Sequence, residues 1–322
     1  MAEIGIAFDG RAPIKTIARQ AWLAEAGGAA TLWIACHLFL RDPVTTATLA
    51  LAATSHVRVA LMAMSPYSVH PVFTAMAAAT LEEMFPGRVI LCLGVGAPAD
   101  LAAAGIAADQ PLATMGEAVA LSRALFAGEP VRHDGQIFRV ADRRLVNAGR
   151  QIPIVLAASG PQMLTLAGRI ADGVLISAAT SIPFIRWCLD HVERGAAGRP
   201  LMKAAIVYTG LAADPAMAHD KLRRKLGFVL RGGHHARNLE LAGTVLDQAA
   251  LTAAYAAEDW ATVDRLIDDA VVRNHAASGT RTEVRAAYEA YGAIGLDELI
   301  VGGADAPGEV VDILGALRGR RA

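Results

Sequence analysis

The feature that most constrains this chain is a repeated alternation of short, continuously apolar runs with longer segments of helical character. The apolar runs lack the apolar–polar alternation of half-exposed strands, which is typical of parallel strands covered by helices on both faces. Eight runs are predicted to be strands: Ile4–Ala7, Thr31–Ile34, Val57–Ala63, Val89–Leu93, Ile154–Ala158, Gly173–Ile176, Ala204–Tyr208 and Glu298–Val301. Eight strand–helix units predict an α/β fold of the (β/α)8 barrel type, with a doubly wound open sheet as the alternative.

Two segments interrupt this alternation. Residues Glu129–Gln151 contain the turn sequence HDGQ at His133–Gln136, which predicts a small β excursion. Residues Asp214–Tyr291 have a mostly helical pattern and precede the last strand. A length of 322 residues suits one large α/β domain as well as two smaller ones. Because the strand–helix alternation resumes after each interruption, we expect a single domain over residues 1–322, with a mostly helical insertion before its last strand.

Composition excludes several classes of function. The chain is 54% hydrophobic and 19% charged, with a net charge of −1, which indicates a globular protein with no electrostatic preference for nucleic acid or an anionic membrane. The three cysteines, Cys36, Cys92 and Cys188, form no CxxC pair, so we expect reduced thiols in the cytoplasm. The histidines show no metal-ligand spacing, so no metal site is predicted.

In a (β/α)8 barrel, ligand-binding groups lie on the loops that follow the carboxyl ends of the strands. After the first strand comes Asp9, which is either an acid at the mouth of the barrel or a turn residue. After the second comes His37, which is either an acid or base or a hydrogen-bonded core residue. Ser65-Pro66-Tyr67 follows the third strand and would face the ligand.

Two further loops are rich in glycine. Gly94 and Gly96 follow the fourth strand and either permit a close approach of a flat ligand or form a tight turn. Ser159-Gly160-Pro161-Gln162 follows the fifth strand and leads into a helix, whose free N–H groups suit a phosphate. An ordinary helix cap is the alternative for this loop.

Taken together, these stretches resemble the luciferase-like superfamily of flavin and deazaflavin barrels, and most closely its methylenetetrahydromethanopterin reductase branch. The resemblance spans nearly the whole chain and rests on IGIAF (4–8), LWIACH (32–37), SPYSVHP (65–71), ATLEEMFPGRVILCLGVG (79–96), GEAVALSRALFAGE (116–129), PIVLAASGPQMLTLAGRIADGVLIS (153–177) and SGTRTEV (278–284). It implies a luciferase-like barrel that binds coenzyme F420, or FMN as the alternative, at the carboxyl ends of its strands.

The resemblance also implies a role for individual residues. A non-proline cis peptide near Met62–Ala63 would support the coenzyme ring from behind, and Ser65 would bond the ring or its ribityl chain. Gly94 and Gly96 would line the mouth, and Ser159, Gly160, Pro161 and Gln162 would hold the coenzyme phosphate. His37 matches a histidine that contacts the ring in related sugar-phosphate dehydrogenases.

Two positions depart from the family pattern. Ala7 stands where the reductases carry a glutamate in the first strand, and Asp9 is the nearby substitute on the same face of an extended strand. Cys36 precedes His37 where relatives carry an aspartate. We therefore assign proton handling to Asp9 and His37 and expect the departures to affect the pterin reaction more than the fold or the coenzyme site.

Three functions remain open at this point. The first is a coenzyme F420-dependent oxidoreductase that resembles methylenetetrahydromethanopterin or methylenetetrahydrofolate reductase and transfers hydride at the deazaflavin C5 to a pterin or similar acceptor. The second is an FMN-dependent monooxygenase, and the third is a non-catalytic coenzyme-binding protein, which the missing acid at Ala7 motivates. The Ala- and Met-rich segment Thr74–Met84 suits a homo-oligomer contact or internal packing equally well.

Overall fold

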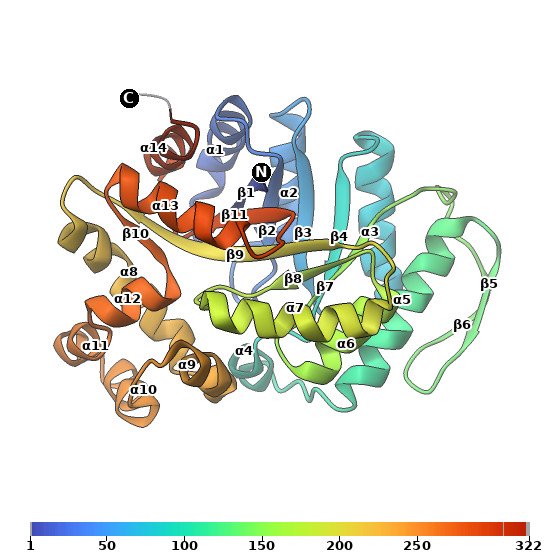
Figure 1. The fold of residues 1–322 in the computed structure, drawn as a ribbon. Helices are drawn as coiled ribbons and strands as arrows, with labels where there is room; N and C mark the ends of the chain where they lie inside the picture. The colour runs from blue at the N-terminus through green and yellow to red at the C-terminus, as the bar shows by residue number, and fades with distance from the viewer. Residues whose placement is uncertain (1, 305, 320–322) are drawn as a thin grey trace. The chain divides into compact units, whose positions relative to one another are not determined.

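The computed structural model describes residues 2–304 and 306–319, and strands alternate with helices along this part of the chain (Figure 1). The eight predicted strands are all present and form the predicted (β/α)8 barrel. They are β1 (Glu3–Phe8), β2 (Thr31–Ala35), β3 (Arg58–Met64), β4 (Val89–Leu93), β7 (Ile154–Ala157), β8 (Gly173–Ile176), β9 (Met202–Leu211) and β11 (Glu298–Gly302). The described residues divide into two compact units.

The barrel strands from β2 to β8 belong to the unit formed by residues 8–175 and 191–202, except for the last residue of β8. These strands follow the order β2-β3-β4-β7-β8 and pair in parallel. Every residue of β2 and of β4 is buried, as expected for strands covered on both faces. The helices of this unit are α1 (Ile14–Ala26), α2 (Pro43–Ala52), α3 (Pro71–Met84), α4 (Pro98–Ala103), α5 (Pro111–Ala127) and α6 (Pro161–Ile170).

Local sequence explains where these helices begin. Pro stands in the first turn of α2, α3 and α6, where its missing N–H costs no helical hydrogen bond. The Asp42 carboxylate caps α2 by accepting a hydrogen bond from the Thr45 N–H at 2.7 Å. The prolines, together with the cap on α2, fix the points at which these loops become helix.

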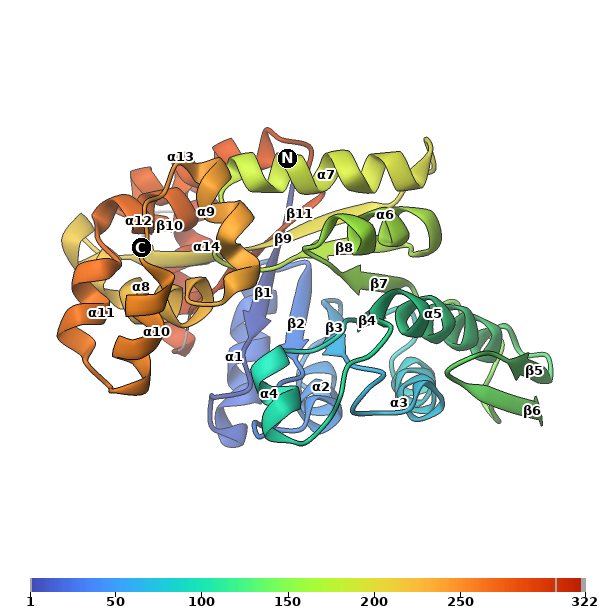
Figure 2. The ribbon, with the colours of Figure 1, turned by 90° about the horizontal axis from the view of Figure 1, so that it is seen from below.

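The predicted β excursion is a hairpin of β5 (Val131–Asp134) and β6 (Arg139–Arg143), which lies beside α5 (Figure 2). The carboxylate of Glu117 on α5 accepts hydrogen bonds from the N–H groups of residues 136, 137 and 138 in the hairpin turn. These bonds lower the pKa of Glu117 against the opposing effect of burial. One carboxylate therefore joins the hairpin to the barrel helices.

The other unit consists of residues 1–7, 176–190 and 203–322, and its strands follow the order β10-β9-β11-β1. It contains the predicted, mostly helical insertion. The elements after β9 are α8 (Pro215–Leu230), η1 (Gly233–His235), α9 (Ala236–Ala242), α10 (Gln248–Ala256), α11 (Trp260–Leu266), α12 (Asp269–His275), β10 (Ala277–Gly279), α13 (Arg281–Gly292) and, following β11, α14 (Pro307–Leu317). α7 (Ile182–Ala196) follows β8. The insertion has a core of its own, built around Leu222, Leu226, Val263 and Val272.

A buried polar network in this second unit holds the segment between β8 and α7. Asn238 is fully buried; its amide donates to the Ala179 carbonyl at 2.7 Å and accepts from the Ser181 N–H at 2.9 Å. The His275 Nδ1 lies 3.2 Å from the same carbonyl and Nε2 lies 2.9 Å from the Thr244 hydroxyl. Because a carbonyl only accepts hydrogen bonds, His275 carries its proton on Nδ1.

Among the described residues, no helix is long and apolar enough to cross a membrane.

The buried polar network around Asn238 and His275 makes the free energy of unfolding depend on pH. Burial lowers the pKa of His275 from 6.5 to about 4. Between these values the unfolded chain binds a proton that the folded protein does not, so stability is present above pH 6.5 and is lost as pH falls toward 4, by about 3 kcal/mol at most. The variant His275→Asn keeps a donor toward Ala179 without a titrating ring, and we expect it to reduce this pH dependence.

Urea titrations at about pH 7 and about pH 4.5 measure this effect. His56→Asn is the matched control, because His56 is exposed and should leave the pH dependence unchanged. An equal loss of stability on acidification in His275→Asn and in the unmodified protein would contradict the assignment.

Candidate coenzyme-binding site

The third strand ends irregularly, as the resemblance implies. The Met62–Ala63 peptide bond is cis, and the register between β3 and β4 shifts between Leu61 and Met64. Both neighbouring strands bond to this bulge: the Cys36 N–H donates to the Met62 carbonyl at 2.5 Å, and the Gly94 N–H donates to the Met64 carbonyl at 3.1 Å. The end of β3 is therefore held from both sides.

Three small residues meet beside this bulge. A Cβ on Gly94 would lie 2.9 Å from the Ala63 Cβ and 3.3 Å from the Ala157 Cβ, which is too close for any side chain larger than hydrogen without movement. Ala63 and Ala157 are half-buried. Ala63, Gly94 and Ala157, from the ends of β3, β4 and β7, are called the small-residue floor below; sequence reasoning predicted its first two members and missed Ala157.

The Ser65 hydroxyl makes its hydrogen bonds within the protein. It is buried, donates to the Val95 carbonyl at 2.7 Å and accepts from the Tyr67 N–H at 3.3 Å. Because its single proton is already donated, Ser65 contributes to a ligand site mainly by holding the turn after β3 against the turn after β4. Gly96, in the second of these turns, has a φ of +96°, and a Cβ added there would lie 3.4 Å from the Ser65 Oγ.

Burial and three charged side chains act on the pKa of His37. Desolvation is the largest influence and lowers the pKa of His37, while Asp100 and Asp9 oppose this effect and Arg11 adds to it. The residue is nevertheless exposed to solvent. Because its pKa is lowered, the imidazole is uncharged at neutral pH.

Asp9 is engaged in a local turn, and the thiol of Cys36 is largely buried. Asp9 accepts a hydrogen bond from the Arg11 N–H at 2.8 Å and pairs with its guanidinium at 3.3 Å, so it forms a local turn as well as lying near His37. Burial raises the pKa of Cys36 to about 11, which keeps it a thiol. The charge of Asp9 thus acts on His37, and Cys36 is a packing residue.

The loop after β7 presents an open helix terminus. α6 begins at Pro161 with Gly160 as its N-cap, and no described side chain caps it. Gly160, Pro161 and Gln162 are exposed and Ser159 is half-buried. No described heavy atom lies within 4 Å of the Cβ that Gly160 lacks, so an anion can approach the first N–H groups of α6 directly.

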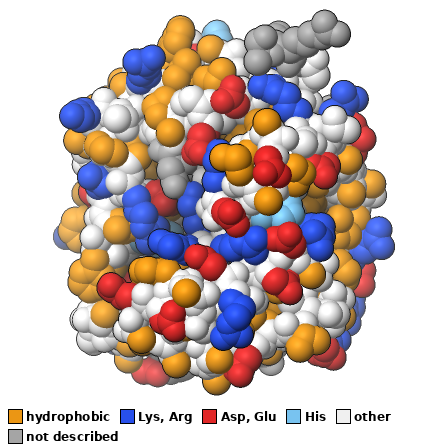
Figure 3. Space-filling view, turned by 90° about the vertical axis from the view of Figure 1, so that its left-hand side faces the viewer, with side chains coloured by type: hydrophobic (Ala, Val, Ile, Leu, Met, Phe, Trp, Pro, Cys, Tyr) orange, Lys and Arg blue, Asp and Glu red, His pale blue; other side chains and the backbone are white. Residues whose placement is uncertain are grey.

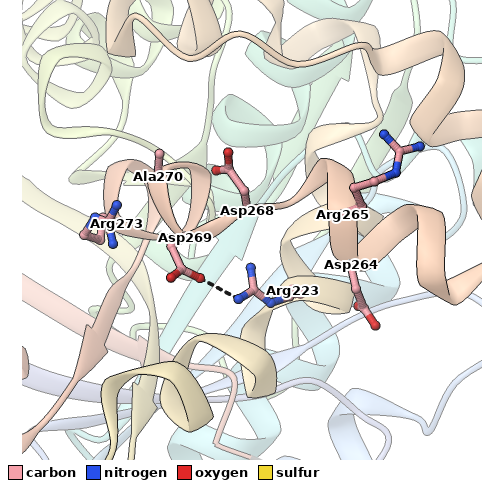
Figure 4. A pocket seen from close by; sticks show the side chains of 7 residues that line it. All are labelled: Arg223, Asp264, Arg265, Asp268, Asp269, Ala270 and Arg273. Atoms are coloured by element: carbon pink, nitrogen blue, oxygen red, sulfur yellow. Dashed lines mark hydrogen bonds and ion pairs between the residues drawn. The ribbon is translucent and has the colours of Figure 1, made fainter.

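Two depressions in the described surface lie away from these loops. One is a wide, open hollow on the helical insertion, lined by Arg223, Asp264, Arg265, Asp268, Asp269, Ala270 and Arg273 (Figure 4). There the Arg223 guanidinium already pairs with Asp269 at 2.5 Å and with Asp220 at 2.8 Å. Figure 3 shows a face on which basic and acidic side chains are interspersed. Paired charges on an open surface are typical of a solvated helix face, so we assign no ligand to this hollow.

A second cavity of about 170 Å³ is lined by residues of β9, α8 and α14. Its Lys221 and Lys225 ammonium groups donate to the carbonyls of Leu211 and Gly303 and so close the ends of two strands. Within the described part of the chain, no three His, Cys, Asp or Glu side chains are arranged to hold a metal ion.

Comparison with known proteins gives consistent results. The family model of luciferase-like monooxygenases matches residues 3–298. The 5,10-methylenetetrahydromethanopterin reductase of Methanolobus tindarius is 34% identical over 71% of each chain. The solved coenzyme F420-dependent tetrahydromethanopterin reductase from Methanopyrus kandleri superposes with a TM-score of 0.89 at 24% identity, covering 98% of this chain and 97% of that one. An F420-dependent secondary alcohol dehydrogenase in complex with an F420–acetone adduct gives 0.81 at 20% identity, covering 100% and 99%. These superpositions confirm the predicted fold.

The small-residue floor makes a direct prediction. The variant Gly94→Ala forces Ala63 or Ala157 to move, because the added Cβ would lie 2.9 Å from one and 3.3 Å from the other. We expect it to weaken binding of a planar coenzyme at least tenfold, or about 1.4 kcal/mol, in a fluorescence titration. Gly116→Ala, on α5 with open space around the added methyl group, is the matched control and should bind normally. Unchanged coenzyme affinity in Gly94→Ala would show that no ligand uses the floor.

Proposed function

Because the chain belongs to the luciferase-like family, we propose that it is a coenzyme F420-dependent oxidoreductase of the methylenetetrahydromethanopterin reductase type. The acceptor would be a methylene-bearing tetrahydromethanopterin or tetrahydrofolate. The named relatives support this choice, since the matches include reductases of that name and coenzyme F420-dependent dehydrogenases. The family match over residues 3–298 also supports one functional domain.

The small-residue floor is the observation that carries the coenzyme assignment. Half-buried methyl groups and a glycine at the ends of three neighbouring strands offer a flat apolar surface to one face of a deazaflavin ring. The open terminus of α6 follows β7, whose last residue, Ala157, belongs to that floor. The N–H groups at Gln162 and Met163 would hold the coenzyme phosphate, with Gly160 leaving room for it.

The bound coenzyme would supply hydride chemistry, and the chain would supply position and a proton carrier. The apolar floor keeps water from one face of the ring. His37 is uncharged at neutral pH because desolvation lowers its pKa, so it could take up the proton that the reduced coenzyme would release with its hydride and deliver this proton to the acceptor. The negative charge of Asp9 would favour the imidazolium that forms, although Arg11 pairs with the same carboxylate.

FMN remains the second candidate cofactor, because the matching family model is that of the luciferase-like monooxygenases. We propose that the protein lies in the cytoplasm, where its three free cysteines would stay reduced.

We also propose that the protein is a homo-oligomer that associates through α3. Phe73, Met76 and Met84 form one stripe along this helix and are 65%, 45% and 54% exposed. Leu49 on α2 adds a further exposed apolar side chain. A surface helix with an apolar outer stripe is expected to be covered by a partner.

Light scattering after size exclusion tests this association. The variant Met76→Arg introduces a charge into the stripe and should shift the mass toward that of a 33.6 kDa monomer. Met217→Arg, at a more exposed methionine on α8, is the control and should keep the mass of the unmodified protein. A monomeric unmodified protein would contradict the oligomer proposal.

The proton-transfer role predicts the behaviour of His37→Gln. With reduced coenzyme F420 and methylenetetrahydromethanopterin under anaerobic conditions, we expect a loss of about 100-fold or more in kcat, followed through the absorbance of the oxidised coenzyme. Coenzyme affinity should change little, because the floor and α6 are untouched. In the unmodified protein, kcat/KM should fall as pH drops through a pKa below 6.5, and this limb should vanish in the variant. Normal turnover by His37→Gln would place proton transfer elsewhere.

A further inference from the structure

The turn that follows β2 contains a residue in an unfavourable backbone conformation. The Leu40 N–H donates to the His37 carbonyl at 3.2 Å, which makes Phe39 the third residue of a four-residue turn. Its φ is +66°. Turns with a positive φ at this position favour glycine or asparagine, and an aromatic residue there is a conformational outlier.

Packing does not explain the phenylalanine. Phe39 is 72% exposed, the most of any phenylalanine among the large exposed hydrophobic residues. Neighbouring Leu40 is better packed, since its Cβ lies 3.4 Å from the position of a Cβ on Gly10. The residue therefore combines an unfavourable backbone conformation with little burial, so the Phe39 side chain contributes little to the stability of the folded protein.

The surroundings hold Phe39 in place. The Arg41 guanidinium donates to the Gly10 carbonyl at 3.1 Å and to the Arg11 carbonyl at 2.8 Å, which joins the turn after β2 to the turn after β1. On the other side, the cap on Asp42 fixes the start of α2. The phenyl ring is thus presented from a braced turn, two residues beyond His37.

We propose that Phe39 is a specificity-determining residue that stacks on the fused ring of the acceptor substrate. This inference rests on the proposed function and deepens it, because it favours a planar heteroaromatic acceptor of the pterin class over a small aliphatic one. The small-residue floor takes one face of the coenzyme ring, whereas Phe39 stands on a loop beyond the strand ends and beside the proton carrier. An exposed aromatic ring there supplies the stacking surface that a pterin needs.

Four variants separate this role from structural effects. Phe39→Asn removes the ring and suits a positive φ, so its Tm should equal or exceed that of the unmodified protein. Phe39→Ala removes the ring without relieving the backbone, and Phe39→Tyr retains a stacking surface. Trp22→Ala is the matched control, because Trp22 is an exposed aromatic residue on the regular helix α1.

Three quantities are measured for each variant. They are the Kd for coenzyme F420, the Kd for methylenetetrahydromethanopterin, determined by calorimetry on coenzyme-loaded protein, and the KM for methylenetetrahydromethanopterin. We expect Phe39→Asn and Phe39→Ala to raise the pterin Kd and KM at least tenfold with the coenzyme Kd within twofold. Phe39→Tyr and Trp22→Ala should match the unmodified protein. Unchanged pterin affinity in Phe39→Asn would overturn the proposal, and a change in mass without a change in affinity would make Phe39 a subunit contact instead.

Binding by the unmodified protein distinguishes a failure of the Phe39 proposal from a failure of the proposed function. Unmodified protein that binds coenzyme F420 but no pterin would overturn the role of Phe39 and leave the coenzyme assignment intact. Unmodified protein that binds neither would overturn both.

Discussion

The close packing of Ala63 against Gly94 is the contact on which the rest of the candidate site depends. It exists because β3 bulges at its end and because residue 94 has no side chain. Ala157, on the next strand, completes the small-residue floor. In the proposed site, a larger side chain at any of these positions would fill space that a planar ligand needs, so the polar groups would come from the surrounding loops.

The polar groups of those loops are of two kinds. Some hydrogen-bond within the protein and fix its shape, as the Ser65 hydroxyl does toward Val95 and as the Arg41 guanidinium does toward the loop after β1. Others remain available to a ligand, namely the His37 imidazole and the first N–H groups of α6. The first kind holds the second in position, which is how a rigid barrel prepares a site before its ligand binds.

Much of this architecture could be predicted from the sequence. Continuous apolar runs identified the eight strands, because both faces of a parallel strand are buried. The turn sequence near Gly135 identified the hairpin. The cis bond at Met62–Ala63 followed from family resemblance, since nothing in the propensities of those residues indicates it.

Other features depended on contacts between distant residues. The partner of Ser65 lies 30 residues away, and the contribution of Ala157 to the floor requires the pairing of β4 with β7. The positive φ of Phe39 contradicts the local preference of phenylalanine, so no sequence rule predicts it. Short α4 escaped prediction because Pro98 after a glycine-rich stretch indicates a loop as readily as a helix start. The clearest misses thus fall where tertiary contacts override local preference.

The central claim is that the floor and the α6 terminus form a deazaflavin site. Equilibrium fluorescence titration of cofactor-free protein with coenzyme F420 and, in parallel, with FMN tests it most directly. The account predicts micromolar or tighter binding of coenzyme F420, with FMN at least tenfold weaker, which corresponds to about 1.4 kcal/mol. The opposite preference would contradict it and would make Ser159–Gln162 the phosphate site of an FMN-dependent monooxygenase.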